Sequence, residues 1–174
     1  MSSYVRAITP GQVSWGSAMS HLRDGLDEVG KLLLKYHEQA THTWEPKVDF
    51  KVKIGRVLTS SKELRVDITT NDKRYLYVDQ GTKPHIIRAK RAKTLAFPSQ
   101  FTPKTRPGEI GSGHGSHGGP TVYTQEVHHP GTKPRKFSVE IVKRSADSTE
   151  AIMQKAMDKV AKEINRMAAQ GGSR

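Results

Sequence analysis

The sequence YLYVDQGTKP, residues 75–84, is the stretch around which this chain is organised. Aromatic and β-branched residues in its first half predict a strand, and Gly81 ends that strand because glycine tolerates a positive φ. The final proline fixes its own φ and restricts the preceding lysine to extended conformations. The residues GTKP recur at 131–134, after a second strand-like run at 121–127. We therefore expect two strand ends, each followed by a conformationally restricted Lys-Pro segment, rather than two unrelated turns.

Length and composition limit the class of protein. The chain has 174 residues, of which 34% are apolar, and this predicts one domain over 14–174 with a thin core, preceded by a flexible arm over 1–13. The absence of cysteine excludes disulfides, thiolate zinc sites and cysteine nucleophiles. The apolar runs are too short for a membrane span, and the N-terminus lacks the layout of a signal peptide. We expect a soluble protein made in the cytosol.

The formal net charge is +12, and its placement is uneven. Residues 81–119 contain seven Lys or Arg against Glu109, and residues 129–144 contain five against Glu140. These two segments follow the two GTKP turns and hold +10 of the +12. Such a concentration suits a nucleic acid or an acidic protein surface better than solubility alone, which an even spread would serve.

Two long helices are predicted from apolar residues at spacings of three and four. The first begins after Ser14 as N-cap and has a stripe that favours a core over a partner groove: Trp15, Ala18, Leu22, Leu26, Val29, Leu33 and Tyr36. The second begins at a capping box of Asp147, Ser148 and Glu150. Its stripe comprises Ile152, Met153, Ala156, Met157, Val160, Ile164 and Met167.

Strand patterns occupy the region between the helices. Residues 48–54 and 64–68 alternate apolar and charged side chains, and 75–79 completes a three-stranded antiparallel meander. The apolar residues of 137–142 fit either a strand or a short helix. The predicted fold class is α+β, a small antiparallel sheet packed by the N-terminal and C-terminal helices.

Residues 83–119 differ from the rest of the chain in composition, and we predict that they form an insertion that extends to about residue 120. They contain the basic run RAKRAK at 88–93 and a tract at 111–119 with five glycines. A tract so rich in glycine holds no helix or strand without outside help. We expect a projecting arm or long hairpin that is fully ordered only in an assembly.

Enzyme chemistry is not indicated. The histidine pairs His114/His117 and His128/His129 invite a metal hypothesis, but the glycine tract offers no rigid frame or supporting groups. Nucleophile-elbow, phosphate-loop and zinc-protease motifs are absent. We predict a protein that is not an enzyme and that uses no cofactor or metal.

Non-specific nucleic-acid binding is the alternative function. Arg88, Lys90, Arg91 and Lys93, with Arg135 and Lys136, are candidate contacts to phosphates or to an acidic partner. No aromatic residue interleaves with the basic run to stack on bases, and no recognition-helix or RNA-binding signature is present.

The layout resembles the small head–tail joining, or tail-completion, proteins in the neck of lambda-like long-tailed bacteriophages. The resemblance rests on the helix–sheet–helix order, on YVDQGT at 77–82 and on HPGTKPRKF at 129–137. Members of that family show Tyr-Val-acid-x-Gly-Thr and a later Pro-Gly-Thr-x-x-x-x-Phe. The resemblance covers about residues 15–169, and the long 83–119 segment is often shorter in relatives.

This resemblance implies a structural virion protein that forms a ring, commonly sixfold, around the DNA path at the head–tail interface. The implied partners are further copies of the chain, the portal or connector, and tail-tube or tail-terminator proteins, with assembly in the host cytoplasm. The expected assembly turns and interface are Tyr77, Asp79, Gly81, Thr82, Lys83, Pro84, Pro130, Gly131, Thr132, Pro134 and Phe137. We hypothesise that the two glycine turns aim the arm and that Tyr77, Asp79 and Phe137 fix those turns to the body.

Overall fold

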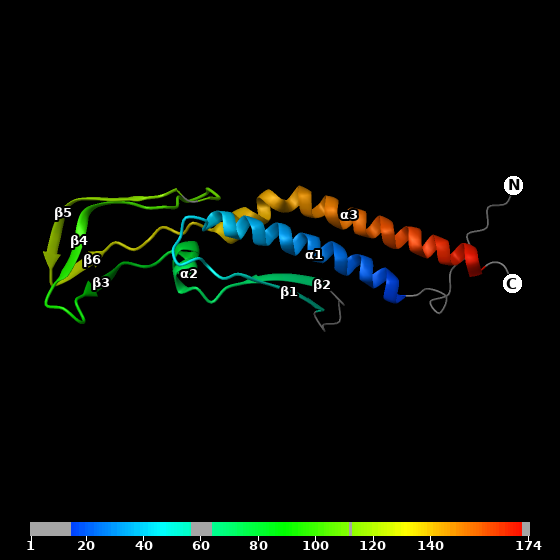
Figure 1. Ribbon diagram of the computed structural model, residues 1–174, viewed down its shortest axis with the longest axis horizontal. Helices are drawn as coiled ribbons and strands as arrows, with labels where there is room; N and C mark the ends of the chain where they lie inside the picture. The colour runs from blue at the N-terminus through cyan, green and yellow to red at the C-terminus, as the bar shows by residue number, and fades with distance from the viewer. Residues whose placement is uncertain (1–14, 57–63, 112, 172–174) are drawn as a thin grey trace. The chain divides into compact units, whose positions relative to one another are not determined.

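The protein is α+β, as expected, with three helices and three two-stranded antiparallel sheets in the described part of the chain. The computed structural model describes residues 15–56, 64–111 and 113–171 (Figure 1). The predicted arm at 1–13 and the Ser14 cap lie outside these ranges. Contacts gather the described residues into two compact units: 15–32, 52–56, 64–67 and 145–171 form the first, and 33–51, 68–111 and 113–144 form the second. The expectation of a single domain stays a prediction.

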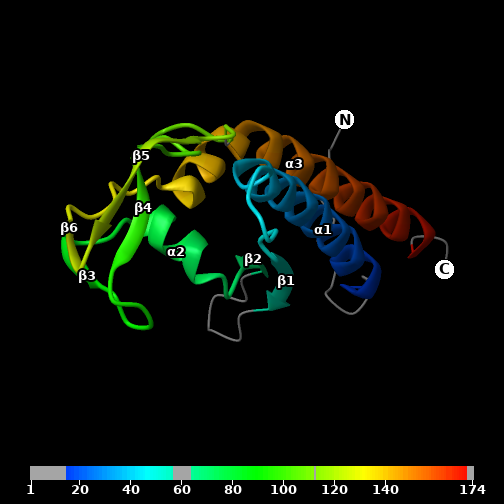
Figure 2. The ribbon, with the colours of Figure 1, turned by 60° about the vertical axis from the view of Figure 1, so that its left-hand side comes forward.

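In the first unit, helix α1 (Trp15–Ala40) up to Leu32 lies beside helix α3 (Phe137–Gly171) from Ser145 onward, and the β1–β2 ladder lies beside α1 (Figure 2). Strand β1 (Lys51–Arg56) pairs with β2 (Leu64–Thr69), as their alternating patterns predicted. The packing is close at two glycines: a Cβ on Gly25 would lie 2.7 Å from the Ala156 Cβ, and one on Gly30 would lie 2.7 Å from a Val52 methyl. Both glycines therefore allow the neighbouring elements to pack more closely than alanine would.

The second unit is built on an aromatic core. Trp44, Tyr75, Phe137 and Ile141 are buried there together with Ala40. The Tyr75 ring meets Phe50 edge-on at 5.0 Å between centroids and lies 5.8 Å from the Phe137 ring. These residues come from α1, the segment after it, α2 and the start of α3, so one small core fixes four segments of the unit.

The third strand of the predicted meander is wrong, because residues 73–80 form helix α2 (Lys73–Gln80). The carboxylate of Asp72 accepts a hydrogen bond from the Arg74 amide at 2.8 Å and caps the helix. Tyr75 is buried, and Val78, one turn later, packs against the same core. Burial at a spacing of three residues outweighs the strand preference of the aromatic and β-branched side chains.

The chain between Thr82 and Thr132 is a long antiparallel hairpin, called the hairpin below. It comprises β3 (His85–Arg88), β4 (Leu95–Thr102), β5 (Ser116–Thr124) and β6 (Glu126–His129). β3 pairs with β6, and β4 pairs with β5. The excursion thus extends beyond the predicted limit near 120. Ser116, His117 and Gly118 of the glycine tract are strand residues because β4 supplies their backbone partners.

The C-terminal helix begins ten residues before the predicted capping box. Residues 137–142, which fitted a strand or a helix, are the first turns of α3, and Asp147 and Ser148 lie inside that helix. Ala156 and Val160 of the predicted stripe are buried, whereas Met157 is 50% exposed. Phe137 and Ile141, one turn apart and both fully buried, hold this early part of the helix in the core.

Candidate functional site: the hairpin and its crossing

The two GTKP repeats pair with each other at the base of the hairpin. The Thr82 amide donates to the Thr132 carbonyl at 3.0 Å, and the Thr132 amide donates back to the Thr82 carbonyl at 3.1 Å. The Thr82 hydroxyl accepts from the same Thr132 amide at 3.0 Å. This reciprocal pair, with the glycine before each threonine, is called the crossing. Its register continues into the β3–β6 ladder.

Both glycines of the crossing are required by their backbone conformation and by space. Gly81 has φ 77° and ψ 174°, and Gly131 has φ 88°. A Cβ on Gly81 would lie 2.5 Å from the Thr132 carbonyl oxygen, and a Cβ on Gly131 would overlap the Thr82 carbonyl oxygen. Each repeat therefore needs glycine because the other repeat passes directly against it.

Asp79 joins the crossing to the start of α3. Its carboxylate accepts from the Ser138 amide at 3.2 Å and from the Ser138 hydroxyl at 2.9 Å. The amides of Arg135 and Lys136 donate to the carbonyls of Val78 and Asp79, each at 3.0 Å. Lys136 adopts a positive φ of 56° immediately before the helix. The end of α2 thus serves as a template for the first turn of α3.

The far end of the hairpin is also held to the rest of the second unit. The Lys104 ammonium donates to the Thr43 carbonyl at 2.9 Å, and the Thr43 hydroxyl donates to the Gly113 carbonyl at 2.8 Å. The Arg135 guanidinium donates to the Thr105 hydroxyl at 3.3 Å, and both residues are buried. A pocket of about 780 Å³ lies between the far end of the hairpin and its base, with Trp44, Phe101 and His129 among its lining residues.

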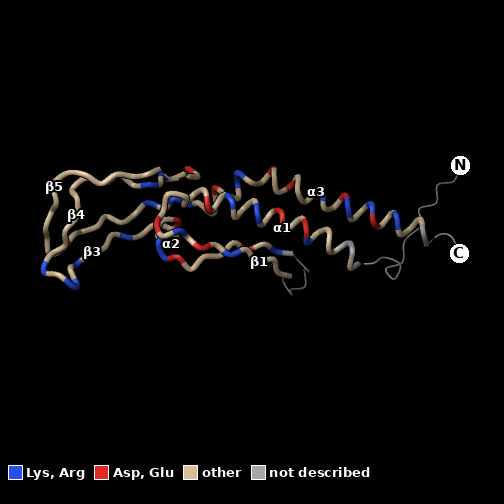
Figure 3. Tube along the Cα trace, in the orientation of Figure 1, with Lys and Arg blue, Asp and Glu red and all other residues tan. Residues whose placement is uncertain are grey.

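A basic bulge, residues 90–94, interrupts the hairpin. Between the Arg88–Glu126 pair and the Leu95–Thr124 pair, the outgoing strand has six residues and the returning strand has one. The Ala89 amide still reaches the Gln125 carbonyl at 3.3 Å, so the register changes after it. Lys90, Arg91 and Lys93 of the bulge are exposed, and Figure 3 shows basic residues (blue) gathered on the backbone between β3 and β4.

The predicted phosphate or acidic-partner contacts separate into three groups. Lys90, Arg91, Lys93 and Lys136 are exposed. Arg88 is exposed but pairs with Glu126 at 3.1 Å, and its hydrogen bond holds the pKa of that carboxyl below the ordinary value. Arg135 was wrongly predicted to face a partner: it is 9% exposed and donates to Thr105 and to the Lys133 carbonyl. Burial with internal partners gives Arg135 a structural role.

The predicted interface residues also differ in position. Gly81, Thr82, Gly131 and Thr132 form the crossing, and Phe137 is fully buried in the core. Lys83, Pro84, Pro130 and Pro134 flank the crossing and are exposed. Tyr77 was expected to fix the turn, but it is 58% exposed and takes no part in the core. Sequence reasoning missed Thr43, Lys104 and Thr105, which carry no local signal because their partners lie far along the chain.

The hairpin exposes large apolar side chains on both of its strands. More than half of the exposed large apolar residues in the described part of the chain belong to it: Ile86, Ile87, Phe97, Phe101, Val122 and Tyr123. Phe101 is 67% exposed and Tyr123 is 70% exposed. A two-stranded ladder cannot bury such side chains by itself, since it has no second layer.

Within residues 15–56, 64–111 and 113–171, no group of three or more His, Cys, Asp or Glu side chains is arranged to hold a metal ion. None of the described helices is sufficiently long and apolar to cross a membrane.

Comparison with known proteins gives no relative. No protein-family model matches the chain, and neither the curated proteins nor the solved structures provide a match.

Proposed function

We propose that this chain is a structural protein of the phage neck, which forms an oligomeric ring between the connector and the tail tube around the DNA path. In this proposal it is not an enzyme, its copies are present in the virion at the head–tail interface, and the ring is sixfold by analogy with the resembling family. The proposal rests on the quoted sequence motifs and on one feature of the hairpin.

That feature is the exposure of apolar side chains on a hairpin with free edges. Each of its ladders has two strands, so each strand has one side without a strand neighbour in the described chain. Free edges and exposed aromatic residues promote association with another chain. A protein that works alone gains nothing from this surface, whereas a ring subunit buries it against its neighbour.

The attachment of the hairpin supports the same proposal. An assembly arm must project its contact residues in a fixed direction, since a loose arm loses entropy when it binds. Here the base is fixed by the crossing and the far end by Thr43, Lys104 and Thr105. The chemistry at the crossing consists of backbone hydrogen bonds and close glycine contacts, which suits a mechanical role.

The oligomeric state of the full chain tests the proposal. Native mass spectrometry and sedimentation velocity are measured on the protein alone and after mixing with purified tails and DNA-filled heads. We expect a closed ring, formed either in solution or on one of those particles. A chain that stays monomeric and binds neither particle would refute the proposal.

A matched pair of variants tests whether the hairpin forms the contact between subunits of the ring. Ile86→Glu with Tyr123→Glu adds charge to the exposed apolar surface of the hairpin, where both side chains lie in solvent. Met157→Glu adds charge at a 50% exposed apolar residue of α3, outside the hairpin. Both proteins should keep the circular-dichroism spectrum of the parent. The hairpin variant should lose ring formation and particle binding, and the α3 variant should retain both.

A further inference from the structure

We propose that the basic bulge, residues 90–94, contacts the phosphate backbone of duplex DNA without reading its sequence. The inference rests on the proposed function in one respect, namely that the genome is the polyanion inside such a ring. The contact itself is argued from the charges and the backbone of the bulge.

The three cations of the bulge have no partner among the described residues. Lys90, Arg91 and Lys93 form no ion pair and no side-chain hydrogen bond with another described residue. The nearest cation along the strand, Arg88, is neutralised by Glu126. Three unpaired like charges within four residues repel one another, so they favour a bound polyanion that relieves the repulsion.

The spacing of these cations suits a duplex. The chain bends at residues 90–94, and even a fully extended chain, at about 3.3 Å per residue, would separate positions 90 and 93 by no more than about 10 Å. Duplex DNA presents one phosphate charge per about 1.7 Å of its axis, or about six over that length. Each cation can therefore reach a separate phosphate. Ala92 and Thr94 are too small to anchor in a protein pocket, and residues 90–94 include no aromatic side chain that could fill one.

The offset in register makes the bulge a separate element of the hairpin. The ladders on either side retain their own pairing, Ile87 with Val127 before the bulge and Phe97 with Val122 after it. Substitutions within 90–94 remove charge without removing a ladder hydrogen bond. The charge of the bulge can therefore be changed separately from the apolar surface proposed for assembly.

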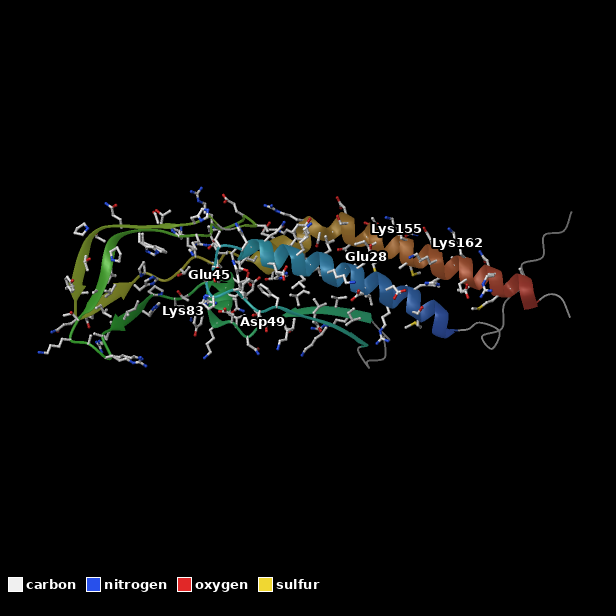
Figure 4. The ribbon with its side chains drawn as sticks, viewed as in Figure 1. Glu28, Glu45, Asp49, Lys83, Lys155 and Lys162 are labelled. Atoms are coloured by element: carbon white, nitrogen blue, oxygen red, sulfur yellow. The ribbon has the colours of Figure 1, made fainter. Side chains whose placement is uncertain are left out.

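The test measures duplex binding by the full chain with fluorescence anisotropy at about 50 and 200 mM salt. The bulge variant carries Lys90→Gln, Arg91→Gln and Lys93→Gln. The control variant carries Lys155→Gln, Lys159→Gln and Lys162→Gln, which removes the same charge from exposed positions of α3. Those lysines share a surface pocket with Asp24 and Glu28 (Figure 4, in which Glu28, Lys155 and Lys162 are labelled).

Three phosphate contacts predict a slope of about −2.7 in log affinity against log salt, which is a loss of about 40-fold between the two salt concentrations. We expect the parent and the α3 control to show at least this loss, and the bulge variant to bind more weakly at low salt with a slope smaller in magnitude by about 2.7. Equal binding by the bulge variant and the parent would overturn the inference. So would displacement of labelled duplex by polyglutamate as effectively as by unlabelled duplex, because the bulge would then be a site for acidic protein.

Sedimentation of the same samples separates this inference from the proposed function. A bulge variant that forms rings and loses duplex affinity supports both. A parent protein that binds duplex through the bulge as a monomer, and forms no ring either in solution or on purified tails and heads, leaves the inference standing and refutes the neck proposal. Rings that bind duplex equally with and without the bulge charges refute the inference alone.

Discussion

Replacement of Gly81 by alanine should be much more destabilising than the same change at Gly108. Both glycines have nearly the same φ, 77° and 76°. At Gly108 nothing lies within 4 Å of a new Cβ, whereas at Gly81 the Cβ would lie 2.5 Å from the Thr132 carbonyl oxygen and 2.9 Å from the Pro134 nitrogen. Both of these atoms belong to backbone, so neither can turn away.

The magnitude follows from two contributions. The conformation at Gly81 is one that residues with a Cβ adopt at a cost of about 1–3 kcal/mol. Separation of the two repeats breaks two backbone hydrogen bonds, each worth about 1 kcal/mol net. Gly81→Ala should therefore lower the free energy of unfolding by about 3–5 kcal/mol, and Gly108→Ala by about 1–2 kcal/mol.

Urea unfolding measures the difference. Trp44 is buried in the core of the second unit, so its fluorescence in a Trp15→Phe background follows that unit. With a slope of about 2 kcal/mol per molar urea, the midpoint should fall by about 2 M for Gly81→Ala and by less than about 1 M for Gly108→Ala. Equal shifts for the two variants would show that contact between the repeats contributes nothing, and the crossing would lose its role as the anchor of the hairpin.

Three further predictions concern the core and the start of α3. Asp79→Ala removes the acceptor of two hydrogen bonds from Ser138 and should lower stability by about 1–2 kcal/mol in the same urea assay, with Asp79→Asn intermediate. The Tyr75 hydroxyl is buried with no hydrogen-bond partner in the described chain, so Tyr75→Phe should raise the free energy of unfolding by about 1 kcal/mol. A loss of stability would contradict the cost assigned to the unpaired hydroxyl. Burial lowers the pKa of His37 from 6.5, although its hydrogen bond with the Leu33 carbonyl acts in the opposite direction. The neutral ring is thus favoured in the folded state, and stability should be complete above pH 6.5 and decline as the pH falls below it. Urea midpoints measured on both sides of pH 6.5 should change less in His37→Gln than in the parent protein. A parent midpoint that rises as the pH falls would contradict the expected loss of stability.

The sequence by itself determined the features that depend on neighbouring residues. The spacing of Leu22, Leu26 and Val29 predicted α1, and alternation predicted β1 and β2. The same local reasoning indicated that Gly81 and Gly131 take a positive φ, which both do. These predictions succeed because helix and strand periods, and the freedom of glycine, act within a few residues.

The tertiary structure decided the rest. Residues 73–80 form a helix because Tyr75 and Val78 reach one core, and α3 begins at Phe137 because that core receives Phe137 and Ile141. The pairing of Thr82 with Thr132 joins positions fifty residues apart, and Arg135 is buried by Thr105 from the far end of the hairpin. Identical GTKP letters indicated two similar turns, but their contact depends on the hairpin bringing them together. A periodic pattern records which face of an element is apolar, whereas the partner of that face is fixed only when distant segments pack.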